Sequence, residues 1–215
     1  PLARVRVVRP DADAAELGER DLLVVTGPEP DFRWRELCAD AIALARRLGV
    51  VEWITLGSIP AAVPHTRPVP ILGTQSSSGL LASGVTPGPA GLLKVPAAAV
   101  SVLDHAVAGA GIPAVGYFAQ IPHYVSGEYP GAAVELLRIT GRHLGADLSS
   151  LPLEDEATLL RTRLDAAAAG DAQTRTYVER MEAMVDEERR PEGDDDPGKR
   201  QEVGEEPLVE VSHAV

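Results

Sequence analysis

The sequence lacks most of the features that mark several large classes of protein. Only one of its 215 residues is cysteine, Cys38, so the chain cannot form an internal disulfide. Cys38 lies on a helical pattern of apolar residues, where a free thiol packs as a small buried hydrophobe. Aromatic residues make up only 4% of the chain, so we expect a core of small aliphatic side chains. These shortages exclude a disulfide-stapled secreted scaffold, and we expect a cytoplasmic protein.

The chain also lacks long apolar runs and a basic surface. No stretch of about 18 apolar residues occurs, and no charged start precedes an apolar segment, so we expect neither a membrane span nor a secretory signal. The formal net charge is -12, without the basic stripe that a nucleic-acid-binding protein needs. The chain begins with Pro1 rather than methionine, so either its native start was removed or it is a fragment.

Apolar runs alternate with helical patterns along the first two thirds of the chain, which predicts an α/β fold. The runs cover Leu22–Val25, Val50–Gly57 and Ile112–Ala119, and the helical patterns cover about 31–48, 96–111 and 129–144. We expect a mostly parallel sheet flanked by helices, in which the three runs are neighbours. Asp31 is expected to cap the first helix.

The last third of the chain has a different composition. Residues 153–169 and 172–190 predict two charged amphipathic helices that form a hairpin. Between Asp186 and Glu210 there are eleven acidic and four basic residues, and from Pro191 onward the chain has too few apolar residues to order itself. We therefore predict an α/β domain at 1–148 that is incomplete at its N-terminus, a helical extension at 149–190 and a disordered acidic tail at 191–215.

Two Pro-His sequences follow predicted strands, Val63–Pro68 after one and Ile121–Tyr124 after another. If the strands are parallel neighbours, both loops lie at the carboxyl edge of the sheet, where open α/β sheets bind ligands. This places seven candidate ligand or interaction residues together: Glu29, Arg33, His65, Thr66, Arg67, His123 and Tyr124. The alternative is a rigid connection, in which prolines fix the path while His65 and Arg67 bond to carbonyls or to Glu29.

No catalytic residues, metal or cofactor are predicted from these candidates. His65 and His123 have no third histidine in an equivalent loop, whereas zinc needs three or four convergent ligands. The chain has no strand-flanked Gly-x-Ser-x-Gly turn for a nucleophilic serine. The small, flexible stretch 73–79 lacks the lysine of a phosphate-binding loop and the dinucleotide-binding pattern.

Four ordered segments resemble the PAC2 family, which includes the proteasome assembly chaperones: Gly27–Trp34, Val63–Pro68, Gly111–Gly116 and Ile121–Val125. The resemblance implies a phosphorylase/hydrolase-like α/β fold, a helical C-terminal extension, self-association and no established catalysis. Family members usually begin with a further strand-helix unit, which is absent here. The Ala, Arg and Gly content suits an actinobacterial source.

The resemblance leads to two hypotheses about function. The first is a non-enzymatic protein-binding module that assists assembly, with proteasome α subunits as clients. The chain ends His213-Ala214-Val215, so it lacks the tyrosine of the C-terminal motif by which some such chaperones dock on proteasome rings. The second is an enzyme or small-molecule binder that uses the sheet-edge loops, because relatives are sometimes labelled as ATP-grasp carboxylate-amine ligases.

Overall fold

The computed structural model describes residues 4–8, 21–88, 98–148 and 150–188, and the predicted acidic tail lies outside them. Its main sheet has the strand order β3-β6-β4-β5. These strands are β3 (Trp53–Ala61), β6 (Ala114–Pro122), β4 (Ile71–Gln75) and β5 (Thr86–Pro87). The helices are α1 (Trp34–Arg47), α2 (Ala99–Gly109), α3 (Pro130–Leu144), α4 (Leu151–Gly170) and α5 (Ala172–Glu188). The predicted α/β class is confirmed.

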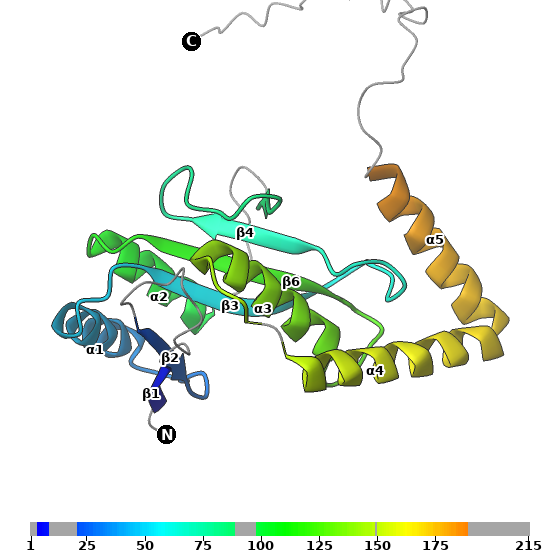
Figure 1. Cartoon of the computed structure of the whole chain (residues 1–215), viewed down its shortest axis with the longest axis horizontal. Helices are drawn as coiled ribbons and strands as arrows, with labels where there is room; N and C mark the ends of the chain where they lie inside the picture. The colour runs from blue at the N-terminus through cyan, green and yellow to red at the C-terminus, as the bar shows by residue number, and fades with distance from the viewer. Residues whose placement is uncertain (1–3, 9–20, 89–97, 149, 189–215) are drawn as a thin grey trace, which may run out of the picture.

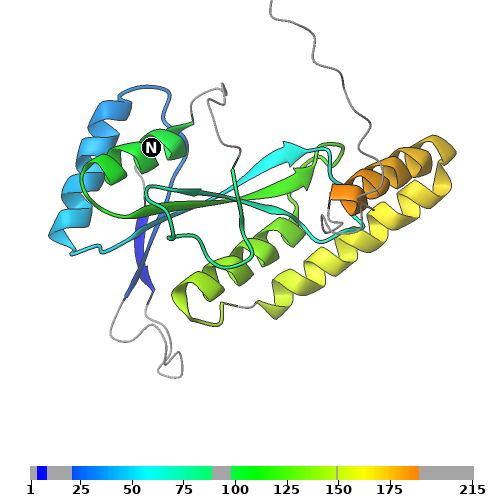
Figure 2. The same cartoon turned by 90° about the horizontal axis from the view of Figure 1, so that it is seen from above.

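Helices cover both faces of this sheet (Figures 1 and 2). Helices α1 and α2 lie on one face and α3 lies on the other. The core on the first face joins Ala45 of α1 to Val107 of α2, and the core on the second joins Val115 and Tyr117 of β6 to Ile139 of α3. Strand β6 is buried on both sides, which explains its nearly continuous apolar sequence.

The prediction that all three apolar runs are parallel neighbours was wrong for the first. Residues Leu22–Thr26 form β2, which pairs antiparallel with β1 (Arg4–Val8) in a separate two-stranded sheet. The apolar pattern of a strand indicates burial but not its partner, and β1 is the partner that precedes it in the chain. The other two runs do pair in parallel, as β3 and β6.

The main sheet is mixed, because β4 is antiparallel to β6. Strand β4 follows β3 after residues 62–70, and a parallel return in one sheet needs a crossover of a dozen residues or more. The direction reverses, and residues 62–70 stay at the carboxyl edge of β3 and β6. This edge is where the predicted loops meet the C-terminal helices.

The two C-terminal helices are confirmed at 151–170 and 172–188 as a helical hairpin, which we call the α4–α5 hairpin (Figure 2). Asp171 begins α5 by accepting the backbone N–H of Thr174 at 2.8 Å. These hydrogen bonds from Thr174 hold the pKa of Asp171 below its ordinary value. Whether the hairpin is a separate domain stays a prediction. None of the helices within the described ranges is long and apolar enough to cross a membrane.

Candidate functional site

The two Pro-His loops lie beside each other, as predicted. Strands β3 and β6 are in parallel register, and Ala61 stands opposite Pro122 at their carboxyl ends. The backbone N–H of His123 then donates to the carbonyl of Ala61 at 3.1 Å, which fixes one loop against the other. The histidines of both loops therefore reach the same edge of the sheet.

His65 joins the two loops to α4. Its side chain is almost fully buried, and the phenolic oxygen of Tyr124 accepts the backbone N–H of His65 at 2.8 Å. The same oxygen lies 2.7 Å from Nδ1 of His65, so the phenol donates its one proton to that nitrogen. In the neutral ring Nε2 then carries the proton and donates to Asp165 of α4 at 3.2 Å. Burial raises the pKa of Tyr124, which keeps the phenol protonated.

The neighbouring Thr66 and Arg67 join the first loop to α5. The guanidinium of Arg67 contacts both carboxylate oxygens of Asp186, at 2.9 and 2.7 Å, and donates to Glu182 at 3.2 Å. The hydroxyl of Thr66 also donates to Glu182. Because the bond to Asp186 favours the charged guanidinium, it raises the pKa of Arg67.

His123 makes the corresponding contact from the second loop. Its Nδ1 lies 2.9 Å from the carbonyl oxygen of Ala61, which can only accept, so Nδ1 carries the proton. Nε2 accepts the hydroxyl proton of Tyr177 of α5 at 2.7 Å. The rings of His123, Tyr124 and Tyr177 pack edge to face against one another.

We call this assembly the loop–hairpin junction. It contains five of the seven predicted residues and four partners from the hairpin, which are His65, Thr66, Arg67, His123, Tyr124, Asp165, Tyr177, Glu182 and Asp186. None of the four hairpin partners was among the residues predicted from the sequence. Glu182 and Asp186 stand one helical turn apart, but nothing in that spacing indicates which loop they contact.

The remaining two predicted residues do not join the junction. The carboxylate of Glu29 accepts the backbone N–H of Ala99 at 2.7 Å, so it caps the start of α2. Arg33 is exposed and pairs with Glu36 within its own segment. The prediction that Asp31 caps the first helix was also wrong, because the N-cap residue of α1 is Arg33, in a left-handed conformation with φ 65°.

The chemistry of the junction is that of a structural joint. Both ring nitrogens of His65 and His123 are hydrogen-bonded to protein groups. A cavity of about 830 Å³ lies between the hairpin and the loops, lined mainly by α4 and α5, with His65 and Tyr124. Its volume suits a small ligand, but the polar atoms of His65 are already paired inside the protein. Among the described residues, no group of three or more His, Cys, Asp or Glu side chains could hold a metal ion.

Several solved structures resemble this chain. A PAC2 family protein from Streptomyces avermitilis is 33% identical, with a TM-score of 0.71, over 82% of this chain and 72% of that protein. A proteasome-assembly chaperone homologue from Mycobacterium tuberculosis is 31% identical, with a TM-score of 0.70 and the same two coverages. A protein of unknown function from Corynebacterium glutamicum is 28% identical, with a TM-score of 0.72, over 78% of this chain.

The chain spans only 62% of the length of the Corynebacterium protein, so it corresponds to part of that relative. No curated protein matches the chain. The model of the PAC2 family matches residues 1–168, which include both Pro-His loops, the whole main sheet and most of α4. The chain therefore belongs to the PAC2 family.

Proposed function

We propose that this protein is a non-enzymatic assembly chaperone of the cytoplasm, which binds proteasome α subunits as clients and associates with itself. Family membership supports the chaperone role, because a relative that is 31% identical is a proteasome-assembly chaperone homologue. The structural observation that carries the proposal is the loop–hairpin junction, which uses the polar groups of the sheet edge to fix the α4–α5 hairpin.

The hairpin offers apolar side chains for a protein contact. Leu151 and Leu159 of α4 are 73% and 52% exposed, and Met184 of α5 is 57% exposed. Because the junction already fixes the helices, binding a partner would order only the rotamers of these side chains. The entropic cost of binding is therefore small. The second hypothesis, an enzyme or small-molecule binder, is supported by the size of the cavity alone.

Native mass spectrometry of the whole chain with proteasome α subunits from the same organism tests the proposal. We expect a discrete mixed complex, and we expect Leu159→Lys and Met184→Lys to weaken it at least tenfold. Val51→Lys is the matched control, because Val51 is 63% exposed but lies before β3, outside the hairpin. If the chain forms no mixed complex with any α subunit, the proposed client is wrong.

A further inference from the structure

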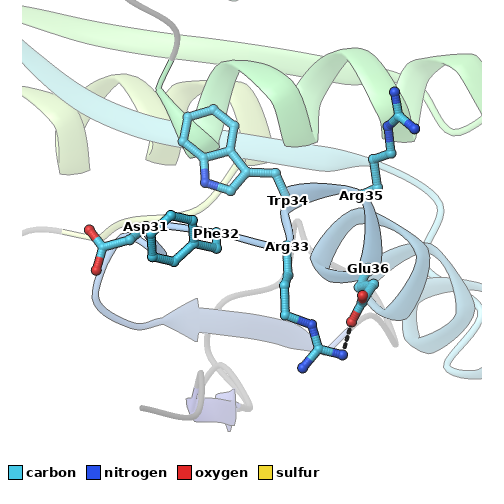
Figure 3. A pocket seen from close by; sticks show the side chains of 6 residues that line it. All are labelled: Asp31, Phe32, Arg33, Trp34, Arg35 and Glu36. Atoms are coloured by element: carbon cyan, nitrogen blue, oxygen red, sulfur yellow. Dashed lines mark ion pairs between the residues drawn. The ribbon is translucent and has the colours of Figure 1, made fainter.

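The segment Asp31–Glu36 presents an apolar side chain to solvent. Phe32 is 81% exposed, the largest fraction among the exposed large apolar side chains of the described residues. Figure 3 shows Asp31 and Phe32 extending to one side, away from α1, while Trp34 turns in another direction. Phenylalanine and arginine are both enriched in protein interfaces relative to the rest of a protein surface.

The segment is ordered, so the exposure of Phe32 is not that of a loose loop. The indole N–H of Trp34 donates to the carbonyl of Pro30 at 2.6 Å, and Glu29 is bonded to the start of α2. Arg33 is the one non-glycine residue with positive φ in the part of the chain that the structure describes. Such conformations persist only where the surroundings impose them, and they gather at binding sites.

The cavity of about 830 Å³ under the hairpin is large enough for a phenylalanine side chain. Its apolar wall includes Leu164, Ala167 and Ala168 of α4 and Val178 of α5. Two charged residues also line it, Asp171 at the start of α5 and Arg180 further along the helix. We call this cavity the hairpin groove.

The charges of the segment and of the hairpin groove are complementary. Asp31 is the residue next to Phe32 in the segment, and Arg180 lines the groove together with its apolar wall. Within the described ranges, neither Asp31 nor Arg180 has an ion-pair partner.

We infer that Phe32 of one copy of this chain occupies the hairpin groove of a second copy, with Asp31 facing Arg180. The inference rests on the self-association in the proposed function and names the surfaces that produce it. The two surfaces differ, so the contact is head to tail, and in an open row only the two end copies have one unused surface each. Such contacts close into rings or extend as filaments.

A complementation experiment by sedimentation velocity tests this arrangement. Phe32→Asp removes the anchor but leaves the groove, whereas Ala167→Trp fills the groove but leaves the anchor. Each variant alone is expected to sediment as a monomer, while an equimolar mixture is expected to form a one-to-one dimer through the one intact pair of surfaces. Val51→Asp is the control for an exposed apolar residue elsewhere, and it should assemble as the unchanged protein does.

The outcomes separate the two proposals. If the unchanged protein assembles and both variants still assemble, the Phe32 contact is wrong although self-association stands. If each variant is monomeric and folded by circular dichroism but the mixture forms no dimer, the head-to-tail geometry is wrong. If the unchanged protein remains a monomer at about 100 μM, where a contact with a micromolar Kd would be nearly saturated, self-association itself fails. Binding to α subunits is measured separately and does not depend on these results.

Discussion

Tyr124 and His65 are joined by two hydrogen bonds that share one phenolic oxygen. The oxygen accepts the backbone N–H of His65 at 2.8 Å and donates to ring Nδ1 at 2.7 Å. This arrangement fixes both the path of the loop and the orientation of the imidazole, because one bond holds the backbone and the other holds the ring. It therefore aims Nε2 at Asp165 of the hairpin.

A related arrangement lies between β6 and α3. The phenolic oxygen of Tyr117 accepts the backbone N–H of Ala82 at 3.0 Å and lies 2.7 Å from Nδ1 of His143, whose Nε2 lies 3.0 Å from Glu52. Tyr117 is fully buried, so here the tyrosine satisfies groups that water cannot reach. In both places a tyrosine sets the direction of a histidine and joins it to a carboxylate.

Tyr124→Phe should destabilise the protein by about 1–3 kcal/mol, because it leaves the backbone N–H and Nδ1 of His65 without their partner. Urea unfolding followed by circular dichroism measures the loss. Tyr177→Phe is the matched control, since its hydroxyl makes one hydrogen bond on an exposed side chain, and it should cost less than about 1 kcal/mol. Equal stability of the two variants would contradict this account of the junction.

Arg67→Ala should loosen α5 more than it unfolds the protein. Arg67 and Asp186 are partly exposed, so their ion pair is screened, and the expected loss of global stability is about 1 kcal/mol or less. Amide hydrogen exchange should nevertheless rise in α5 and stay unchanged in α2, because Arg67 contacts α5 through Glu182 and Asp186.

Arg163→Ala is the control for this experiment. Arg163 is exposed on α4, and no carboxylate of the described residues lies within ion-pair distance of it. Exchange in α5 should therefore be the same as in the unchanged protein. An Arg67→Ala variant with unaltered exchange in α5 would show that apolar contacts of Val178, Met181 and Val185 hold the helix without help.

The parallel pairing of β3 with β6 was predicted correctly, and it places His65 and His123 at one edge. Two apolar runs joined through a helical pattern favour a parallel crossover, although the same reasoning failed for β2, which pairs with β1. The alternative hypothesis for the Pro-His loops, a rigid connection in which His65 and Arg67 bond to other protein groups, agrees with the hydrogen bonds of both residues. Its expected partners were wrong, however, because Arg67 bonds to Asp186 rather than to Glu29.

The rest depends on contacts between distant parts of the chain. Thr66 and Glu182 are separated by more than a hundred residues, and the exposed charges of an amphipathic helix do not reveal which of them meets a partner. The left-handed conformation of Arg33 could not be predicted either, because Asp31 is a preferred N-cap residue and stands just before the helical pattern.

Asp104 should make stability depend on pH. It lies on α2 and accepts the hydroxyl proton of Thr55, and burial raises its pKa above the ordinary value of 3.8. The raised pKa means that the folded state favours the neutral acid. The neutral acid therefore stabilises the fold below the ordinary pKa of 3.8, and this stabilisation is lost as the pH rises through the folded pKa. Asp104→Asn keeps an acceptor but no charge, and its stability relative to the unchanged protein should increase from about pH 4 to pH 7 in urea unfolding.

Asp171→Asn should show the opposite trend and serves as the control. Hydrogen bonds from Thr174 lower the pKa of Asp171, so the carboxylate stabilises the fold above its ordinary pKa of 3.8, and this is lost as the pH falls through the folded pKa. The variant should be less stable than the unchanged protein at pH 7, and the difference should shrink below about pH 4. The same slope for both variants would mean that burial does not govern Asp104.

Gly141 and Gly131 lie on the same helix, α3, and should respond in opposite directions to alanine. A Cβ atom at Gly141 would collide with the carbonyl oxygen of Ala146, which the chain brings back against the helix, so Gly141→Ala should cost about 1–3 kcal/mol. A Cβ atom at Gly131 would meet the ring of Tyr129 at 3.5 Å, an ordinary contact, so Gly131→Ala should gain up to about 1 kcal/mol. Thermal unfolding measures both. Because helix propensity favours alanine over glycine at both sites, a gain at Gly141 would mean that the segment after α3 does not pack there.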